Sequence, residues 1–352
     1  MTDAATVDVL VVGDLNPDLI VSRIHEDRAG EQVEHDAVVF TTLGGSGGIC
    51  AAGLARLGVR TALCAAVGDD DMGRAARRML ESAGVRLDAV EVLADRSSGI
   101  SVHVLADHDR AIYTDRGAIV DLRVAEALRC LDILEPRHVH ICALYLIPAL
   151  AKDGGRIVDA AHSVGATVSV DTNFDPTDEF AMPDWLTQVD YLLPNETEAL
   201  RLTGRSDGDD VWAAARELAG DGALVAIKRG ARGALAVRGT QSVHAHPGAA
   251  DQIVDSVGAG DSFDAGLIRA ILDGRADANA LAFACACGTL STRASGGTSA
   301  QPVLAEALEF MASIRVRHGS GASTPDHTGA PGFPGYRAED APEGAPGNAY
   351  GR

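Results

Sequence analysis

One stretch of the chain combines residue types that could handle a phosphoryl group. In DSVGAGDSFDAG, residues 255–266, the small residues Gly258, Ala259 and Gly260 precede Asp261 and the apolar pattern of a helix. Backbone N–H groups at a helix start lack partners and carry the positive end of the helix dipole, so they attract an anion. Asp261 would lie in the first turn, where its carboxylate could accept the proton of a hydroxyl that attacks phosphorus. A plain helix cap in a loop is the alternative interpretation.

A second glycine-rich stretch opens another predicted helix. In LGGSGGICAAGLARLG, residues 43–58, Gly44, Gly45 and Ser46 precede small and apolar residues at helical spacing. The glycines permit a ligand to approach the backbone closely. The stretch is no P-loop, because GxxxxGK[ST] occurs nowhere in the chain. Neither glycine cluster spells GxGxxG, so nicotinamide-dependent dehydrogenases lose their main sequence support.

Polar side chains follow the first predicted strand. The apolar run at residues 7–12 is typical of a buried strand in a parallel sheet, and Asp14, Asn16 and Asp18 come directly after it. Open α/β sheets bind ligands at the carboxyl ends of their strands. These three residues are therefore candidates for ligand contacts, with capping of the turn as the alternative.

Two later strands end in the same way. Asp171 and Asn173 end the strand in TVSVDTNFD, and the strand at residues 189–193 is followed by Asn195 and Glu198. Asn and Glu three residues apart at a helix start lie on one face of the helix. They could hold the water molecules of Mg²⁺, which prefers oxygen ligands and keeps much of its hydration. A capped helix with Glu in its first turn is the alternative.

A basic residue precedes a further glycine turn. The segment ALVAIKRGARGALAV, residues 223–237, predicts a strand, a turn at Gly230 and Gly233, and a returning strand, with Lys228 just before the turn. A cation there could face phosphate groups, although a lysine at a strand end is more often simply solvated.

The elements that must position these residues alternate between strand and helix, which predicts a doubly wound α/β domain. Two segments break this pattern with polar and apolar alternation, which indicates strands that have one wet face. They predict a small β-sheet lid formed by residues 18–42 and 97–120. Such a lid would exclude water from a reacting phosphoryl group.

The motifs, taken together and in this order, resemble those of the PfkB (ribokinase-like) carbohydrate kinases over residues 7–316. The resemblance implies a ribokinase-like fold and transfer of the γ-phosphoryl group of ATP to a sugar hydroxyl, with Mg²⁺ as cofactor. It implies that Asp261 is the catalytic base and that the amides of Gly258, Ala259 and Gly260 form an anion hole.

The resemblance also implies the binding residues. Those on the substrate side are Asp14, Asn16, Asp18, Gly44, Gly45, Ser46, Asp171 and Asn173. Those on the nucleotide side are Asn195, Lys228, Gly230 and Gly233. Asn195 and Glu198 would order Mg²⁺ through water, and Asp255 would shape the loop or help to hold a monovalent cation such as K⁺.

One position departs from the family pattern. Ile49 stands where the first motif usually has an Asn that helps to bind the sugar. The identity of the acceptor is therefore open, and a nucleoside (adenosine-type) kinase is an alternative to a sugar kinase. A ligand-binding relative without turnover is a second alternative, against which the intact GAGD argues.

The composition of the chain limits which kinds of molecule can be its partners. The chain has 352 residues, 46% of them apolar, and a formal net charge of −20. This charge argues against nucleic acid and anionic membranes as partners, because both require a basic face. The six cysteines include no CxxC pair, which favours buried free thiols. The N-terminus lacks the basic region of a signal peptide, and no apolar run reaches the ~18 residues of a membrane helix, so a cytoplasmic location is expected.

The ends of the domain are predicted from composition as well. From His318 onward the chain contains eight Gly and five Pro, which predicts a kinase domain at residues 1–317 and a disordered tail at residues 318–352. An exposed lid sheet can pair with a second copy, so a homodimer through the lid is a further expectation.

Overall fold

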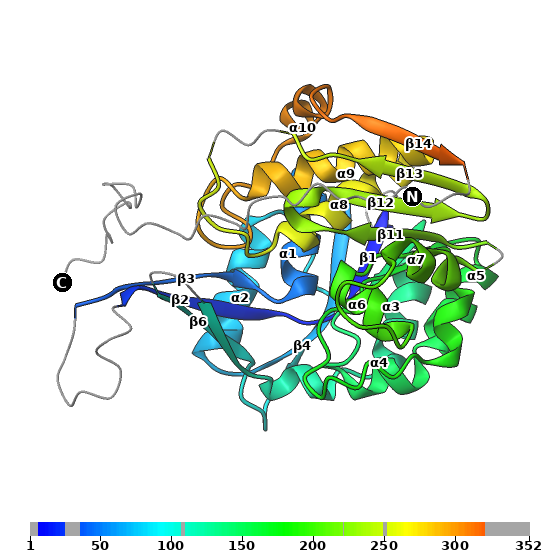
Figure 1. Cartoon of the computed structure of the whole chain (residues 1–352). Coiled ribbons are helices and arrows are strands. Elements are labelled where there is room, and N and C mark those ends of the chain that lie inside the picture. Colours follow the sequence, from blue (N-terminus) through cyan, green and yellow to red (C-terminus); the bar gives the residue numbers. More distant parts are fainter. Residues whose placement is uncertain (1–5, 25–35, 107–109, 221, 249–251, 321–352) are drawn as a thin grey trace.

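The computed structural model describes residues 6–24, 36–106, 110–220, 222–248 and 252–320. A ten-stranded sheet runs through the molecule, in the order β14-β13-β12-β11-β10-β9-β8-β1-β4-β5 (Figure 1). The strands from β11 to β5 in this order pair in parallel, whereas β12, β13 and β14 pair antiparallel at one edge. The strands of this sheet are β1 (Val9–Val12), β4 (Thr61–Gly68), β5 (Val90–Leu93), β8 (His138–Ile141), β9 (Thr167–Val170), β10 (Tyr191–Leu192), β11 (Leu224–Lys228), β12 (Ala234–Arg238), β13 (Gln241–Ala245) and β14 (Val316–Ser320).

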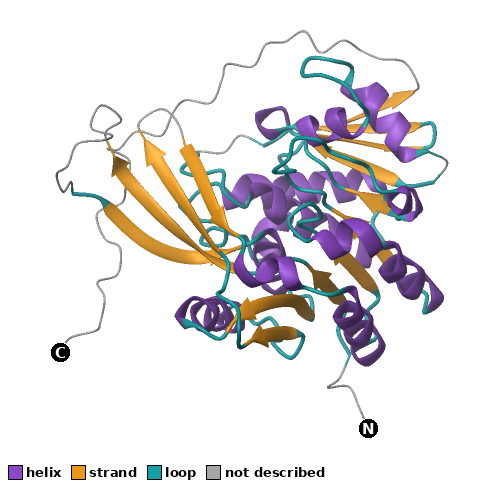
Figure 2. Cartoon of the chain, turned by 90° about the horizontal axis from the view of Figure 1, so that it is seen from below, coloured by secondary structure: helices purple, strands orange, loops and turns teal. Residues whose placement is uncertain are grey.

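Helices cover both faces of this sheet (Figure 2). One face packs against α1 (Ser46–Arg56), α2 (Asp71–Ser82), α8 (Ala259–Leu272), α9 (Asp277–Ser291) and α10 (Leu304–Met311). The other face packs against α3 (Val124–Leu134), α4 (Pro148–Asp153), α5 (Gly155–Ser163), α6 (Glu196–Leu202) and α7 (Val211–Ala219). Short 3₁₀ turns occupy Gly117–Asp121, Asp184–Gln188 and Gly230–Arg232.

The core is divided by the sheet into two apolar layers. In β1, Leu10 and Val12 enter one layer, whereas Val9 and Val11 enter the other. Successive side chains of a strand point to opposite faces, so a strand buried on both faces must be apolar throughout. This requirement explains the continuous apolar run at the start of the chain. All six cysteines lie in these layers as free, buried thiols, as predicted.

A smaller sheet stands apart from the large one, in the order β3-β2-β6-β7 (Figure 2). Its strands are β2 (Asn16–Ile24), β3 (Val38–Gly44), β6 (Ile100–Ala106) and β7 (Arg110–Asp115). In β2 the even-numbered Asn16, Asp18 and Ile20 are buried, whereas Leu19 and Val21 are partly exposed. The inner face of this sheet therefore begins with the polar residues that follow β1.

The predicted fold class is confirmed: a doubly wound, mostly parallel sheet is flanked by helices and carries a small second sheet. Residues 25–35 and 107–109 of the predicted lid and residues 321–352 of the predicted tail lie outside the described residues. The predicted boundary at residue 317 lies inside β14, because residues 316–320 pair with β13. Within the described ranges, none of the helices combines the length and apolar character needed to cross a bilayer.

Candidate active site

The candidate residues gather at the carboxyl ends of the strands in the large sheet. Asp14 follows β1, Asp171 follows β9, Asn195 follows β10, and Lys228 is the last residue of β11. The strand order reverses beside β1, since the chain first adds β4 and β5 on one side and later β8 and β9 on the other. Ligands of open α/β sheets bind at such a reversal. The topology therefore brings these distant segments to one edge.

The GAGD loop forms the start of α8. Gly258 is the N-cap residue and has a φ of 71°, a left-handed conformation that favours glycine. A Cβ at this position would lie 2.6 Å from the Cα atom of Gly297, so the loop also packs closely against a second glycine turn. Asp255 ties the two turns together, because its Oδ1 accepts the N–H of Val257 and its Oδ2 accepts the N–H of Gly296, both at 2.9 Å. The proposed contact of Asp255 with a monovalent cation stays a prediction.

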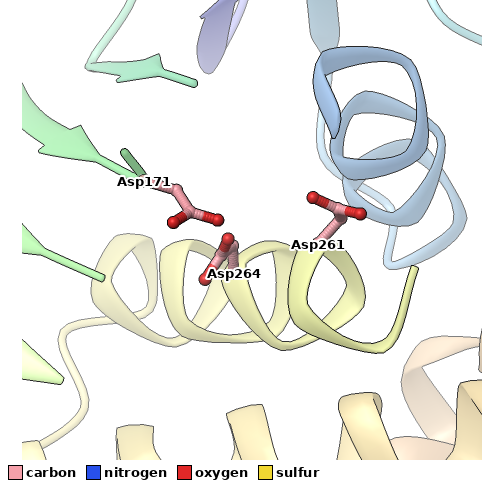
Figure 3. A group of neighbouring side chains, drawn as sticks. All are labelled: Asp171, Asp261 and Asp264. Carbon is pink, nitrogen blue, oxygen red and sulfur yellow. The ribbon is translucent and has the colours of Figure 1, made fainter. Parts of the chain in front are cut away.

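Asp261 lies in the first turn of α8, and its side chain points toward α1 (Figure 3). Burial raises the pKa of its carboxyl to about 7, and the negative charge of Asp171 adds to this effect. Lys228 and a hydrogen bond from Ser46 act in the opposite direction. A group with a pKa near neutrality suits general base catalysis, because it can be ionised and still bind a proton effectively.

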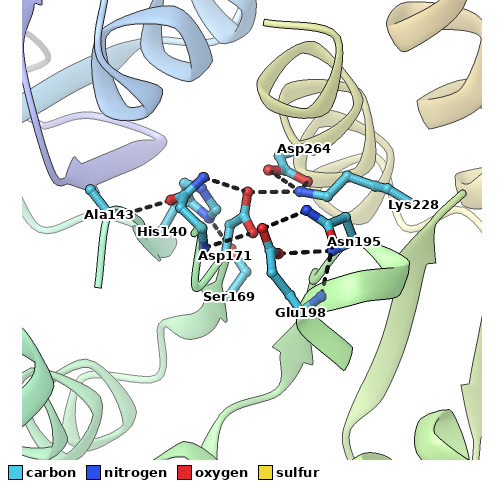
Figure 4. A network of polar contacts seen from close by, with 9 residues as sticks. His140, Ala143, Ser169, Asp171, Asn195, Glu198, Lys228 and Asp264 are labelled. Carbon is cyan, nitrogen blue, oxygen red and sulfur yellow. Dashed lines mark hydrogen bonds and ion pairs between the residues drawn. The ribbon is translucent and has the colours of Figure 1, made fainter. Parts of the chain in front are cut away.

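An ammonium group connects the sheet to α8. The Nζ of Lys228 donates to Asp171 Oδ2 at 2.7 Å and to the carboxylate oxygens of Asp264 at 3.1 and 3.2 Å (Figure 4). Only 11% of the Lys228 side chain is exposed. Burial raises the pKa of Asp171, but Lys228, together with a hydrogen bond to Asp264, outweighs this effect and holds that pKa below its usual value. Burial raises the pKa of Asp264 well above its usual value.

A neutral hydrogen-bonded row lies behind Asp171 on β8 and β9. Ser169 Oγ bonds to His138 Nε2 at 2.7 Å and to His140 Nδ1 at 2.8 Å. Burial lowers the pKa of His138 to about 3 and that of His140 to about 4, so both rings are neutral at physiological pH. Asn173 completes this wall, because its Nδ2 donates to Asp171 Oδ2 at 3.1 Å and its Oδ1 accepts the N–H of Ala143 at 2.6 Å.

A second polar cluster lies where the lid meets the large sheet. Asn16 Nδ2 donates to Asp18 Oδ1 at 2.9 Å and to Ser101 Oγ at 3.2 Å, and Ser101 Oγ lies 3.0 Å from Thr114 Oγ1. His103 Nε2 lies 3.3 Å from Asp18 Oδ2. All of these side chains come from β2, β6 and β7, so the small sheet supplies the whole cluster.

The start of α1 joins this cluster to Asp261. A Cβ at Gly44 would lie 2.0 Å from Asp18 Oδ1, so glycine is required for the close approach of that carboxylate. Gly47 donates its N–H to Asp14 Oδ1 at 2.9 Å, and the intervening Ser46 bonds to Asp261. Gly45 is the N-cap residue of α1. The predicted substrate residues on β2 and α1 are thus contiguous with the predicted base.

Asn195 and Glu198 form a reciprocal cap on α6. Asn195 Oδ1 accepts the N–H of Glu198, and Glu198 Oε2 accepts the N–H of Asn195, both at 2.9 Å. The Nδ2 of Asn195 also donates to Glu198 Oε1 at 2.5 Å. Burial, followed by the charge of Asp171, raises the pKa of Glu198 to about 8. The helix-cap interpretation is therefore realised, and a role in ordering Mg²⁺ stays a prediction.

A pocket of about 430 Å³ lies beside this cap. It is lined by Asn195, Glu196, Thr197, Leu200, Asp207, Gly208, Lys228, Arg229, Gly230 and Arg232. Gly230 thus lines the pocket, whereas Gly233 closes the turn, where a Cβ would lie 2.1 Å from the carbonyl oxygen of Ala245. Lys228 lines the same pocket while its ammonium group is bound to Asp171 and Asp264.

Ile49 fills the space below both glycine turns. It is 3% exposed, and Cβ atoms placed at Gly297 and Gly258 would lie 2.5 and 3.0 Å from its side chain. It therefore supports the GAGD loop by packing. This contact explains how an apolar residue is accommodated where the family pattern has Asn.

Sequence reasoning did not single out Asp264, Ser101 or Thr114. Asp264 could have been found from its spacing, because residues three apart on a helix share a face and Asp261 precedes it by three. Ser101 alternates with apolar residues in the predicted lid, but alternation alone does not reveal which face is inner.

Comparison with known proteins adds to this geometry. Residues 7–304 match the model of the pfkB family carbohydrate kinases. The chain is 34% identical over 263 residues to the ATP-dependent ribose-1-phosphate kinase of Halopiger xanaduensis, which covers 73% of this chain and 82% of that protein. It is 30% identical over 305 residues to the ribokinase of Bacillus subtilis, with 86% and 99% covered.

Structural comparison agrees. The fold matches the solved structure of the Arabidopsis thaliana ribokinase complexed with ribose and ATP, with a TM-score of 0.74 and 24% identity. The match covers 87% of this chain and 99% of that one. With a family model that spans most of the sequence, the chain belongs to the pfkB family of carbohydrate kinases.

Proposed function

We propose that this carbohydrate kinase transfers the γ-phosphoryl group of ATP to a hydroxyl group of a small sugar, with Asp261 as the general base. The observation that supports this most strongly is the position of Asp261 between two sets of groups. Asp261 directly follows residues 258–260 at the start of α8, and it is hydrogen-bonded to Ser46 at the start of α1, which leads to Asp18. The pKa of about 7 suits proton abstraction at physiological pH.

In this proposal Asn16 and Asp18 hold the acceptor through its hydroxyl groups, and Asp261 takes the proton of the reacting hydroxyl. That oxygen forms a bond to the γ-phosphorus while the bond from phosphorus to the bridging oxygen of ADP breaks. The products are a sugar phosphate, ADP and the proton left on Asp261. The amides of residues 258–261 stabilise the negative charge on the transferred group. The lid covers the reacting groups and limits hydrolysis.

We assign the pocket beside α6 to the nucleotide. Gly230 lets a nucleotide approach the backbone closely, and Asn195 lines the same pocket. Glu198 fits a site for hydrated Mg²⁺, because it is a buried carboxylate among other carboxylates and a divalent cation would offset their repulsion. Such a cation supplies charge neutralisation for the phosphates when it is bound.

We infer that the acceptor is a pentose or a pentose phosphate, because the two relatives described above act on ribose or on ribose 1-phosphate according to their names. The polar cluster of Asn16, Asp18, Ser101 and His103 offers both donors and acceptors to hydroxyl groups. A sugar matches such a surface better than an apolar base would.

The test is ADP formation by the purified protein with ATP, Mg²⁺ and a panel of acceptors that includes ribose, ribose 1-phosphate, hexoses and nucleosides. We expect turnover with a pentose or its phosphate, and a loss of about 10²–10⁴-fold in kcat for Asp261→Asn, the range typical of a lost general base. Turnover that survives in Asp261→Asn would refute the role of Asp261. Preference for nucleosides would refute the sugar assignment and leave the phosphoryl transfer intact.

We also propose a homodimer formed through the outer face of the lid, and a cytoplasmic location. On this face of the lid, Val39 and Tyr113 are 54% and 65% exposed. Exposed apolar groups gathered on one sheet are typical of a contact surface.

A further inference from the structure

Lys228 has an unusual position for a lysine. The chain has thirty basic residues, of which only Lys152 and Lys228 are lysines. Lys152 is exposed on α4, whereas Lys228 is buried beneath the candidate active site. A buried ammonium group is costly unless it is paired, and here both Asp171 and Asp264 pair with it.

The contact reaches the catalytic helix one turn after Asp261. Asp264 follows Asp261 by three residues, so the two carboxylates lie on one face of α8 (Figure 3). Oxygens of Asp171, Asp261 and Asp264 lie within 4.8 Å of one another. The Nζ of Lys228 also lies against the first turn, since a Cβ at Gly260 would be 3.7 Å from it. Lys228 therefore links the end of β11 and the end of β9 to the turn that carries Asp261.

The charges around Asp261 are mostly negative. The titratable and hydrogen-bonding groups that affect the ionisation of Asp261 come from every element packed against it. They are Asp14 after β1, Ser46 and Cys50 on α1, Cys142 after β8, Asp171 after β9, Glu198 on α6, Lys228 on β11 and Asp264 on α8. Lys228 is the cation in this set. Without it, each carboxylate would make ionisation of the others less favourable.

We propose that Lys228 is a positioning residue for phosphoryl transfer, which fixes the first turn of α8 through Asp264 and supplies the positive charge that keeps Asp261 in its carboxylate form. The proposal rests on the role of Asp261 as base. It gives Lys228 a function different from the nucleotide contact that the sequence predicted, because its donors are directed to Asp171 and Asp264.

The test is the pH profile of kcat/KM for the acceptor in the full-length enzyme. In Lys228→Gln, which keeps N–H donors but loses the charge, we expect the acid limb to move up by about 1–2 pH units, the usual effect of an opposite charge at this range. Activity should fall about 10- to 100-fold at pH 6.5 and recover largely at pH 9, where the base is ionised again. Lys228→Met should shift the limb equally, Lys228→Arg should leave it in place, and the exposed Lys152→Gln is the matched control.

The alternatives give different results. If Lys228 contacted the nucleotide phosphates, Lys228→Gln would raise the KM for ATP and leave the acid limb unmoved, and the proposal would be overturned. An acid limb that moves in Lys228→Arg as far as in Lys228→Gln would also overturn it. If Asp261→Asn keeps turnover, the role of the base has failed; if Asp261→Asn is inactive while the limb of Lys228→Gln stays in place, only the present inference has failed. Should Lys228→Gln not fold, as judged by circular dichroism, Lys228→Met and Lys228→Arg still give the comparison.

Discussion

Asp261 shows how a catalytic requirement opposes stability at the level of one residue. Its carboxyl has a pKa of about 7 in the folded protein, mainly because of burial, whereas the same group in an unfolded chain ionises near a pH of about 4. As the pH rises between these values, the unfolded chain ionises first, so the unfolded state is favoured. Above pH 7 the folded protein has lost all of the stability that corresponds to this difference in pKa. The same raised pKa makes Asp261 an effective base near neutrality.

Replacement of Asp261 by Asn should therefore stabilise the protein in a pH-dependent way. Asn has a similar shape and does not ionise, so it avoids the cost. We expect a gain of about 1–3 kcal/mol at pH 8, reduced because Asp261 is partly exposed, and a smaller gain at pH 5. Urea unfolding at several pH values measures it, with the exposed Asp153→Asn as control. A stability difference that does not change between pH 5 and pH 8 would contradict the raised pKa.

At the level of elements, the start of α8 depends on a turn that only glycine fits. Gly258 combines a left-handed φ of 71° with close packing, because a Cβ on this residue would lie 2.6 Å from the backbone of Gly297. Gly274, which follows α8, has a similar φ of 67°, but a Cβ there would meet nothing within 4 Å. Substitutions at Gly258 and Gly274 therefore separate the cost of the left-handed conformation from the steric cost of close packing.

Gly258→Ala should therefore be much more harmful than Gly274→Ala. We expect Gly274→Ala to cost about 1 kcal/mol of stability and to leave kcat unchanged, since only the left-handed conformation is penalised. Gly258→Ala should cost about 2–4 kcal/mol and lower kcat by at least about 100-fold, because the amides move away from the transferred group. Unfolding experiments and ADP formation measure the two effects. Equal losses in both variants would show that the contact with Gly297 does not shape the loop.

The sequence predicted the elements better than the contacts between them. The apolar run before Asp14 and the helical spacing after Asp261 indicated β1 and α8, because burial on both faces and helix periodicity leave direct marks in a sequence. The strand at residues 189–193 is reduced to Tyr191–Leu192, although Leu193 still donates its N–H to the carbonyl oxygen of Val170 at 2.8 Å. The GAGD loop was located, but its packing against Gly297 and Ile49 was not, because this contact joins segments that lie far apart in the chain.

The residues of the candidate site also divide into those that local sequence patterns identified and those whose contacts join distant segments. Asp261 and Asp18 were identified from local patterns, and the structure brings both to the start of α1. The partners of Lys228 were not predictable, because a lysine at a strand end looks the same in the sequence whether it is solvated or bound to Asp171 and Asp264. Likewise, nothing local indicates that Ser101 bonds to Asn16, since the pairing of β2 with β6 is set by the whole sheet.

At the scale of the whole molecule, the lid has two faces with different tasks. Residues that pair in register form rows across its four strands, and alternate rows point to opposite faces. The row through His103 and Ile20 is buried at its centre and faces the site, whereas the row of Val39, Val21 and Val104 is exposed or half-buried. The outer face is therefore apolar on the same element that supplies Ser101 and His103 to the acceptor cluster.

Association through this face would also hold the inner face in place, since both belong to one sheet. We expect the protein to sediment as a dimer, and Val39→Lys combined with Val104→Lys to weaken the dimer by about 100-fold or more, because two buried charges in a contact cost several kcal/mol. Val164→Lys, at a position 60% exposed at the end of α5, is the matched control and should remain dimeric. Analytical ultracentrifugation over a concentration series measures the dissociation constant, and the KM for the acceptor should rise as the dimer dissociates. A double variant that sediments like the parent protein would place the contact elsewhere, and a monomeric variant with an unchanged KM would separate assembly from acceptor binding.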